Sequence, residues 1–62
     1  MHEEEYKGGV ITVDVLKRGN GWTWSYQIDG GSLHECRDRL LPNQKIALSE
    51  ALQEAKAEID RL

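Results

Sequence analysis

The chain of 62 residues has few of the features that stabilise small domains through covalent or metal links. It contains one cysteine, so it forms no internal disulfide, and no set of cysteines and histidines has the spacing of a structural zinc site. A domain this short buries only about 60% of the surface of its unfolded chain. Self-association is the remaining common way to add buried area, so the composition predicts a homodimer without a cofactor or metal.

Long apolar runs and an excess of basic residues are also missing. No stretch approaches the roughly 20 apolar residues of a membrane span. The acidic start, residues 1–5, has no apolar run behind it, so we expect no signal peptide and a cytoplasmic protein. Eight basic and eleven acidic side chains give a formal net charge of −3. This balance argues against nucleic acid as the main partner, although a local basic patch is compatible with it.

What the sequence does contain is strand periodicity. Residues 22–29 alternate with a period of two, which places four large side chains on one face: Trp22, Trp24, Tyr26 and Ile28. Residues 9–17 are rich in β-branched side chains and predict a strand. Residues 32–37 predict a weaker edge strand guarded by charges. Residues 1–7 contain three consecutive glutamates and are predicted to be a disordered tail.

Two hairpin registers are compatible with the first turn signal, residues 17–21. A two-residue turn at Asn20-Gly21 places Val15 opposite Tyr26, whereas a four-residue loop at residues 18–21 places Val15 opposite Trp24. The second register is favoured because it pairs aromatic with β-branched side chains throughout. A two-residue turn at Gly30-Gly31 would place Leu33 opposite Ile28, with His34 and Cys36 on the polar face.

A helix is predicted over residues 43–61. Pro42 marks the boundary, and either Asn43 is the N-cap or Pro42 is the first helical residue. No glycine or proline follows, and one apolar stripe recurs at steps of four and three: Leu48, Leu52, Ala55, Ile59 and Leu62. The chain therefore predicts a single α+β domain, a three-stranded antiparallel meander with one C-terminal helix packed on one face.

Three groups of residues are candidates for function. His34 and Cys36 lie two apart, hence on one side of a strand, but nothing in the sequence orients them for catalysis, and no enzyme activity is predicted. A basic and aromatic cluster is a candidate binding surface, because such clusters grip nucleic acid: Lys17, Arg18, Trp22, Arg37 and Arg39. Spare apolar helix surface is a candidate dimer contact: Ile46, Leu48, Leu52 and Ile59.

Two families resemble parts of this sequence. Residues 50–59, Glu-Ala-Leu-Gln-Glu-Ala-Lys-Ala-Glu-Ile, look like the start of the helix in the N-terminal domain of HicB-family antitoxins, which also runs strand, strand, strand, helix. Residues 22–30, with a tryptophan strand and an Asp-Gly turn, resemble the arm-type DNA-binding domain of tyrosine recombinases. The third strand of that domain is strongly basic, unlike residues 32–37 here. The short acidic chain also resembles small uncharacterised bacterial and phage proteins.

The sequence thus predicts a small non-enzymatic interaction module that binds a protein partner and forms a homodimer. The contact surface is expected at the third-strand edge or on the spare apolar surface of the helix. The alternative is a nucleic-acid-binding domain that uses the hairpin tip and the third strand. These two hypotheses differ in the expected salt dependence of DNA binding.

Overall fold

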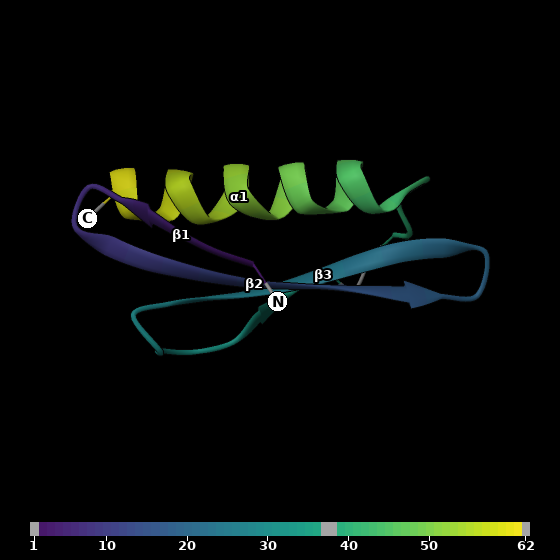
Figure 1. Ribbon diagram of the computed structural model, residues 1–62, viewed down its shortest axis with the longest axis horizontal. Helices are drawn as coiled ribbons and strands as arrows, with labels where there is room; N and C mark the ends of the chain where they lie inside the picture. The colour runs from purple at the N-terminus through teal and green to yellow at the C-terminus, as the bar shows by residue number, and fades with distance from the viewer. Residues whose placement is uncertain (1, 37–38, 62) are drawn as a thin grey trace.

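The computed structural model describes residues 2–36 and 39–61. Its elements follow the order β1 (His2–Tyr6), β2 (Gly9–Arg18), β3 (Gly21–Ile28), β4 (His34–Glu35) and α1 (Gln44–Asp60). The strands form one antiparallel sheet in the order β1-β2-β3-β4. Helix α1 lies along one face of this sheet (Figure 1). The α+β class and the C-terminal helix are therefore confirmed, with four strands instead of three.

The fourth strand is at the N-terminus, where a disordered tail was expected. Lys7 and Gly8 have φ values of 50° and 84°, both positive as a type I′ hairpin turn requires. They fold β1 back on β2, so that Tyr6 pairs with Gly9 and His2 with Val13. For residues 2–7 the prediction was wrong, because β1 pairs with β2 and two of its side chains, Glu4 and Tyr6, find partners on α1. Met1 lies outside the described residues.

Those partners lie at the end of α1. The Lys56 ammonium is 2.7 Å from the Glu4 carboxylate, and the Lys7 ammonium is 2.7 Å from the Asp60 carboxylate. Each ion pair lowers the pKa of its carboxyl group, through Lys56 for Glu4 and through Lys7 for Asp60. The ammonium groups of Lys56 and Lys7 thus hold β1 and its turn against α1. They offset the repulsion among the glutamates of β1.

The β2–β3 hairpin has the favoured register. Val15 pairs with Trp24, Val13 with Tyr26 and Ile11 with Ile28. The two central turn residues are Gly19 and Asn20, and the positive φ of 60° falls on Gly19, as expected for a type II′ turn with glycine first. Both strands end within one residue of the predicted limits.

The helix begins as predicted, but of the predicted apolar stripe only Ala55 is fully buried, and Leu62 lies outside the described residues. The Asn43 side chain accepts a hydrogen bond from the Ile46 N–H at 2.9 Å, so Asn43 is the N-cap. The fully buried positions are three alanines spaced by four residues: Ala47, Ala51 and Ala55. Leu48, Leu52 and Ile59 are only half-buried beside them. Small side chains at the centre let the helix approach the bulky rings of β3.

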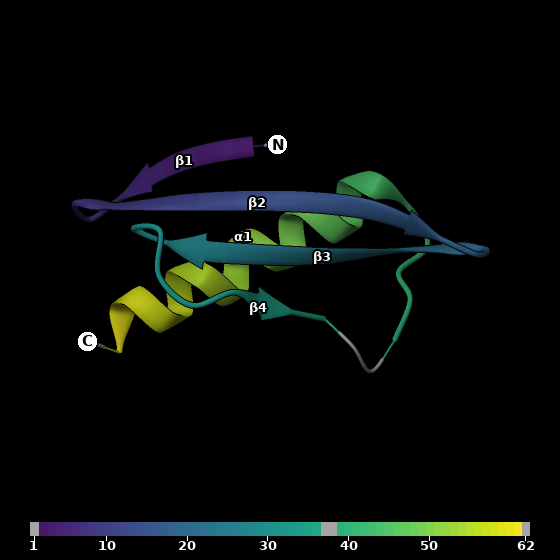
Figure 2. The same ribbon diagram turned by 90° about the horizontal axis from the view of Figure 1, so that it is seen from below.

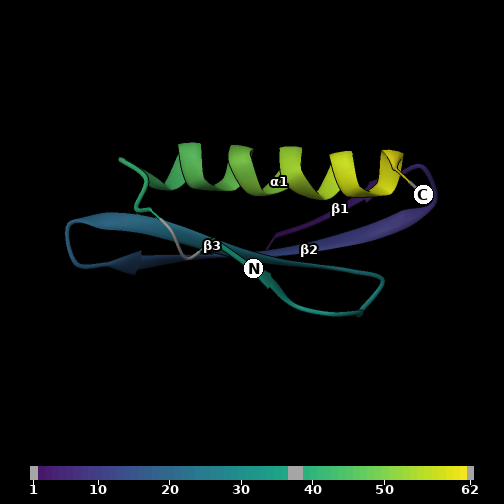
Figure 3. The ribbon, with the colours of Figure 1, turned by 180° about the vertical axis from the view of Figure 1, so that it is seen from behind.

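The core between helix and sheet is small. Its large members come from the two central strands: Ile11, Val13, Trp24 and Tyr26. The Trp24 and Tyr26 rings lie 5.6 Å apart between centroids. Cys36 and Leu41 complete the buried set. The fold therefore protects one face of its sheet and leaves the other without a covering layer among the described residues (Figure 3).

Strand β4 is shorter than expected, and its side chains face the other way. The turn centres on Asp29-Gly30, closed by a hydrogen bond from the Gly31 N–H to the Ile28 carbonyl at 2.9 Å. The turn brings Ile28 and Gly31 opposite each other, and the next pair in the ladder is Tyr26 with His34. Tyr26 is two positions from Ile28, whereas His34 is three positions from Gly31, so the second arm of the hairpin contains one extra residue. The extra residue reverses the faces of the strand. His34 and Cys36 consequently lie on the helix side, not on the polar face.

Candidate interaction surface

The side of the sheet away from α1 is here called the uncovered face. The pairing register assigns to it the alternate side chains of all four strands: Glu3, Glu5, Val10, Thr12, Asp14, Leu16, Arg18, Thr23, Ser25, Gln27 and Glu35. Four of these side chains are carboxylates, and each belongs to an exposed residue: Glu3, Glu5, Asp14 and Glu35. Leu16 is 58% exposed and Val10 is 37% exposed. The uncovered face is therefore acidic, with two exposed apolar side chains on β2.

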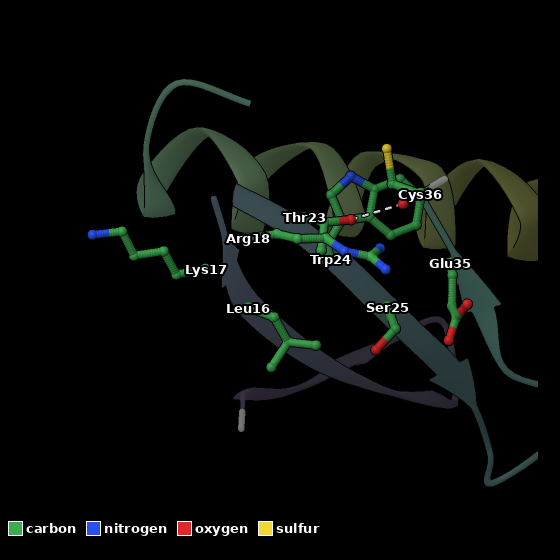
Figure 4. A pocket seen from close by; sticks show the side chains of 8 residues that line it. All are labelled: Leu16, Lys17, Arg18, Thr23, Trp24, Ser25, Glu35 and Cys36. Atoms are coloured by element: carbon green, nitrogen blue, oxygen red, sulfur yellow. Dashed lines mark hydrogen bonds between the residues drawn. The ribbon is translucent and has the colours of Figure 1, made fainter. Parts of the chain in front are cut away.

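A shallow pocket of about 670 Å³ opens at the hairpin end of the uncovered face (Figure 4). Its lining residues come from β2, β3 and the segment after Ser32: Leu16, Lys17, Arg18, Thr23, Trp24, Ser25, Glu35 and Cys36. Thr23 is buried, and its hydroxyl donates a hydrogen bond to the Cys36 carbonyl at 2.7 Å. The Lys17 side chain extends away from the other lining residues (Figure 4). The pocket lining thus includes both a cation and a carboxylate, from Arg18 and Glu35, together with two hydroxyl side chains and a leucine.

The predicted basic cluster is only partly assembled. Lys17 lies opposite Trp22 at the hairpin end, and Arg18 lies opposite Gly21. Lys17 and Arg18 are exposed, whereas Trp22 is half-buried against the core. The Arg39 guanidinium forms an ion pair with the Glu50 carboxylate of α1, so part of its charge is neutralised. Arg37, the fifth member, lies outside the described residues.

The His34 and Cys36 pair also belongs to the interior side. The His34 ring stacks on the Tyr26 ring, with centroids 4.8 Å apart and planes 15° apart. The His34 Nε2 lies 3.5 Å from a Glu58 carboxylate oxygen, and the Tyr26 hydroxyl donates to the same oxygen at 3.1 Å. Cys36 is buried, and its thiol donates to the Arg39 carbonyl. The His34 contact therefore joins β4 to α1, whereas the Cys36 thiol packs in the core and bonds to the segment that follows it.

The Tyr26 hydroxyl has an unusual environment at this contact. Burial raises the pKa of Tyr26 to about 12, and the hydrogen bond to the Glu58 carboxylate adds to the shift. The phenol therefore stays protonated at all physiological pH values and acts as a donor. It ties the centre of β3 to the last turns of α1.

The predicted dimer residues occupy different environments. Ile46 is 43% exposed near the start of α1. Leu48, Leu52 and Ile59 are half-buried and pack against the core cluster. A Cβ added to Gly9 would lie 3.3 Å from the Ile59 side chain, so Ile59 sits on the start of β2. Of the four predicted dimer residues, Ile46, Leu48 and Leu52 are therefore the ones that present apolar surface away from β1.

Within the described residues, part of β2 has an unpaired backbone edge, which the sequence did not predict because it depends on how far β1 extends along β2. Strand β1 pairs with Gly9 through Val13, whereas β2 continues to Arg18. Figure 2 shows β1 beside only one half of β2. No strand among residues 2–36 and 39–61 lies on the outer side of Val15 and Lys17. We call this backbone segment, Val15 to Lys17, the outer edge of β2.

Other possibilities are limited within the part of the chain that the structure describes. No group of three or more His, Cys, Asp or Glu side chains there could hold a metal ion. The helix found there is not long and apolar enough to cross a membrane. In comparisons with known proteins, no family model, no curated protein and no solved structure matches the chain. The resemblances to antitoxin and recombinase domains therefore stay predictions.

Proposed function

We propose that this protein is a non-enzymatic interaction module that acts as a homodimer and binds a protein partner. The observation that carries the proposal is the incomplete protection of its sheet. Ile11 and Val13 are the only large side chains with less than 2% exposure among the described residues, and the buried helix positions are alanines. A core this small stabilises an isolated domain weakly, and a second copy adds buried area.

Exposed apolar side chains support association. Within residues 2–36 and 39–61, five large ones are exposed: Val10, Leu16, Leu33, Leu40 and Ile46. Single exposed apolar residues are ordinary, but Val10 and Leu16 lie on the same strand and the same uncovered face. Sedimentation equilibrium at high micromolar concentration tests the homodimer. We expect twice the mass of one chain, and a monomer at every concentration would overturn the proposal.

The protein partner is expected to be basic. Glu3 and Glu5 lie on the uncovered face together with Asp14 and Glu35, and opposite charge steers association and sets partner choice. A lysine-rich peptide is a suitable probe. The variant Glu3→Gln should bind it more weakly than Glu54→Gln, which removes one exposed carboxylate from α1 instead. Equal weakening by both variants would indicate binding through net charge alone and would refute a role for the uncovered face.

The second candidate function is nucleic-acid binding through the hairpin tip. It is supported by the exposure of adjacent Lys17 and Arg18 beside Trp22. The carboxylates of the uncovered face oppose it, because they repel phosphates. A gel shift with a short DNA duplex distinguishes the two functions. A salt-sensitive shift that disappears in Lys17→Ala/Arg18→Ala would favour this second function, and no shift at micromolar protein would exclude it.

A further inference from the structure

The outer edge of β2 has backbone groups directed away from the sheet. Tyr6 and Gly9 flank a two-residue turn, so they form a hydrogen-bonded pair, and alternate residues of β2 bond to β1. By this alternation, Gly9, Ile11 and Val13 face β1. The same alternation directs the N–H and C=O groups of Val15 and Lys17 to the same side, beyond the end of β1. A short incoming strand can therefore pair there, provided that it turns away before the position beside Val13, which His2 of β1 occupies.

We propose that this edge pairs antiparallel with the same edge of a second copy, with Leu16 on the two-fold axis. The inference deepens the homodimer proposed above and rests on it. Val15 of each copy then lies opposite Lys17 of the other, and each such pair exchanges two backbone hydrogen bonds. The two sheets become one continuous sheet with both helices on the same side.

The side chains on the uncovered face are self-complementary in this register. Leu16 meets Leu16 of the second copy in a pair without backbone hydrogen bonds, where side chains approach most closely. This contact covers a leucine that is 58% exposed in one chain. Asp14 lies opposite Arg18 of the second copy on either side of the axis, and opposite charges in such cross-strand pairs are stabilising.

Neighbouring registers are less favourable. A shift of two residues in one direction places Lys17 opposite Lys17, and like charges directly opposite each other are destabilising. A shift in the other direction requires the outward groups of Val13, which already pair with His2 of β1. A shift by one residue would place the backbone N–H and C=O groups that point towards the second copy opposite residues whose backbone groups point the other way, towards their own sheet. The register centred on Leu16 is therefore preferred.

The flank of α1 supports the same surface. Residues 48, 52, 56 and 60 recur every four positions and form one row along the helix. Where β1 is present, the row is charged: Lys56 contacts Glu4, and Asp60 contacts Tyr6 and Lys7. Beyond the end of β1 the row continues as Leu52 and Leu48, both half-buried. The helix thus offers leucines above the strand position that β1 leaves empty, and a strand of the second copy would cover them.

Two matched pairs of variants test the inference. Leu16→Lys places two ammonium groups at the axis and should weaken the dimer roughly tenfold or more. Leu33→Lys is the control, because Leu33 is similarly exposed, at 55%, outside the interface. Sedimentation equilibrium measures both, and circular dichroism verifies that each variant keeps its helix. A dimer equally strong in both variants would overturn the proposed edge.

A disulfide reports the register directly. In the proposed dimer the two Leu16 Cα atoms lie about 4.5 Å apart, within the range that a disulfide spans. Leu16→Cys should therefore form a covalent dimer under mild oxidation, whereas Thr12→Cys, on the same face beside β1, should not. A wild-type dimer without the Leu16→Cys crosslink would refute this interface and leave the homodimer standing. A wild-type monomer would refute both.

Discussion

The alanine line of α1 gives the sharpest test of how helix and sheet pack. Ala51 is fully buried at the middle of the line, with Ala47 one turn before it and Ala55 one turn after it. A leucine at position 51 needs space between helix and sheet that the buried cluster already fills. Such overpacking typically costs about 1–3 kcal/mol. Because domains of this size are stabilised by roughly 0.05–0.15 kcal/mol per residue, Ala51→Leu should remove a large share of the free energy of unfolding.

The matched control is Ala57→Leu on the exposed side of the same helix. Alanine and leucine have similar helix propensities, so the comparison isolates packing. Urea unfolding followed by tryptophan fluorescence measures both variants, at one protein concentration because dimerisation shifts apparent stability. We expect a clearly lower midpoint for Ala51→Leu and a midpoint near wild type for Ala57→Leu. Equal midpoints would show that the helix does not pack through its alanines.

Three further perturbations address single contacts. Asn43→Ala removes the N-cap acceptor of the Ile46 N–H and should cost about 1 kcal/mol in urea unfolding. Gly21→Ala should destabilise by about 1–3 kcal/mol, because the added Cβ would lie 2.5 Å from the Leu40 Cβ. The raised pKa of Tyr26, about 12, contributes stability that is complete below pH 10 and is lost as pH rises towards 12. Ultraviolet titration of wild type against Tyr26→Phe should show the late phenolate, and its appearance near pH 10 would contradict the burial argument.

Local signals were sufficient for the central hairpin and the helix. The alternation of residues 22–29 identified the apolar face of β3, and the pairing of aromatic with β-branched side chains selected the register of β2 and β3. The boundary at Pro42 and the cap at Asn43 fixed the start of α1. These features depend on residues close in sequence, where propensity and periodicity carry most of the information.

Strand β1 could not be predicted in the same way. Its three consecutive glutamates repel one another in isolation, and the contacts that hold the strand come from the other end of the chain. Lys56 pairs with Glu4, and the Tyr6 hydroxyl donates to the Asp60 carboxylate at 3.1 Å. The only local signal was the Lys7-Gly8 turn, because glycine tolerates positive φ. Three consecutive charged residues before such a turn are compatible with both a tail and an edge strand.

The candidate surfaces in the structure differ from those predicted for a related reason. Each depends on the exact residue at which a strand or turn begins or ends. A single extra residue between Gly31 and His34 moved His34 and Cys36 from the polar face to the interior. It thereby replaced a candidate reactive pair with a contact that holds β4 to Glu58. The extent of β1 was the other boundary, since within the described residues it pairs only with Gly9 through Val13 and the outer edge of β2 has no neighbouring strand there. The row of α1 at positions 48, 52, 56 and 60 differs from the apolar stripe predicted in the sequence, which it shares only at Leu48 and Leu52. Its charged part, Lys56 and Asp60, contacts residues of β1 and the following turn, whereas Leu48 and Leu52 are half-buried and apolar.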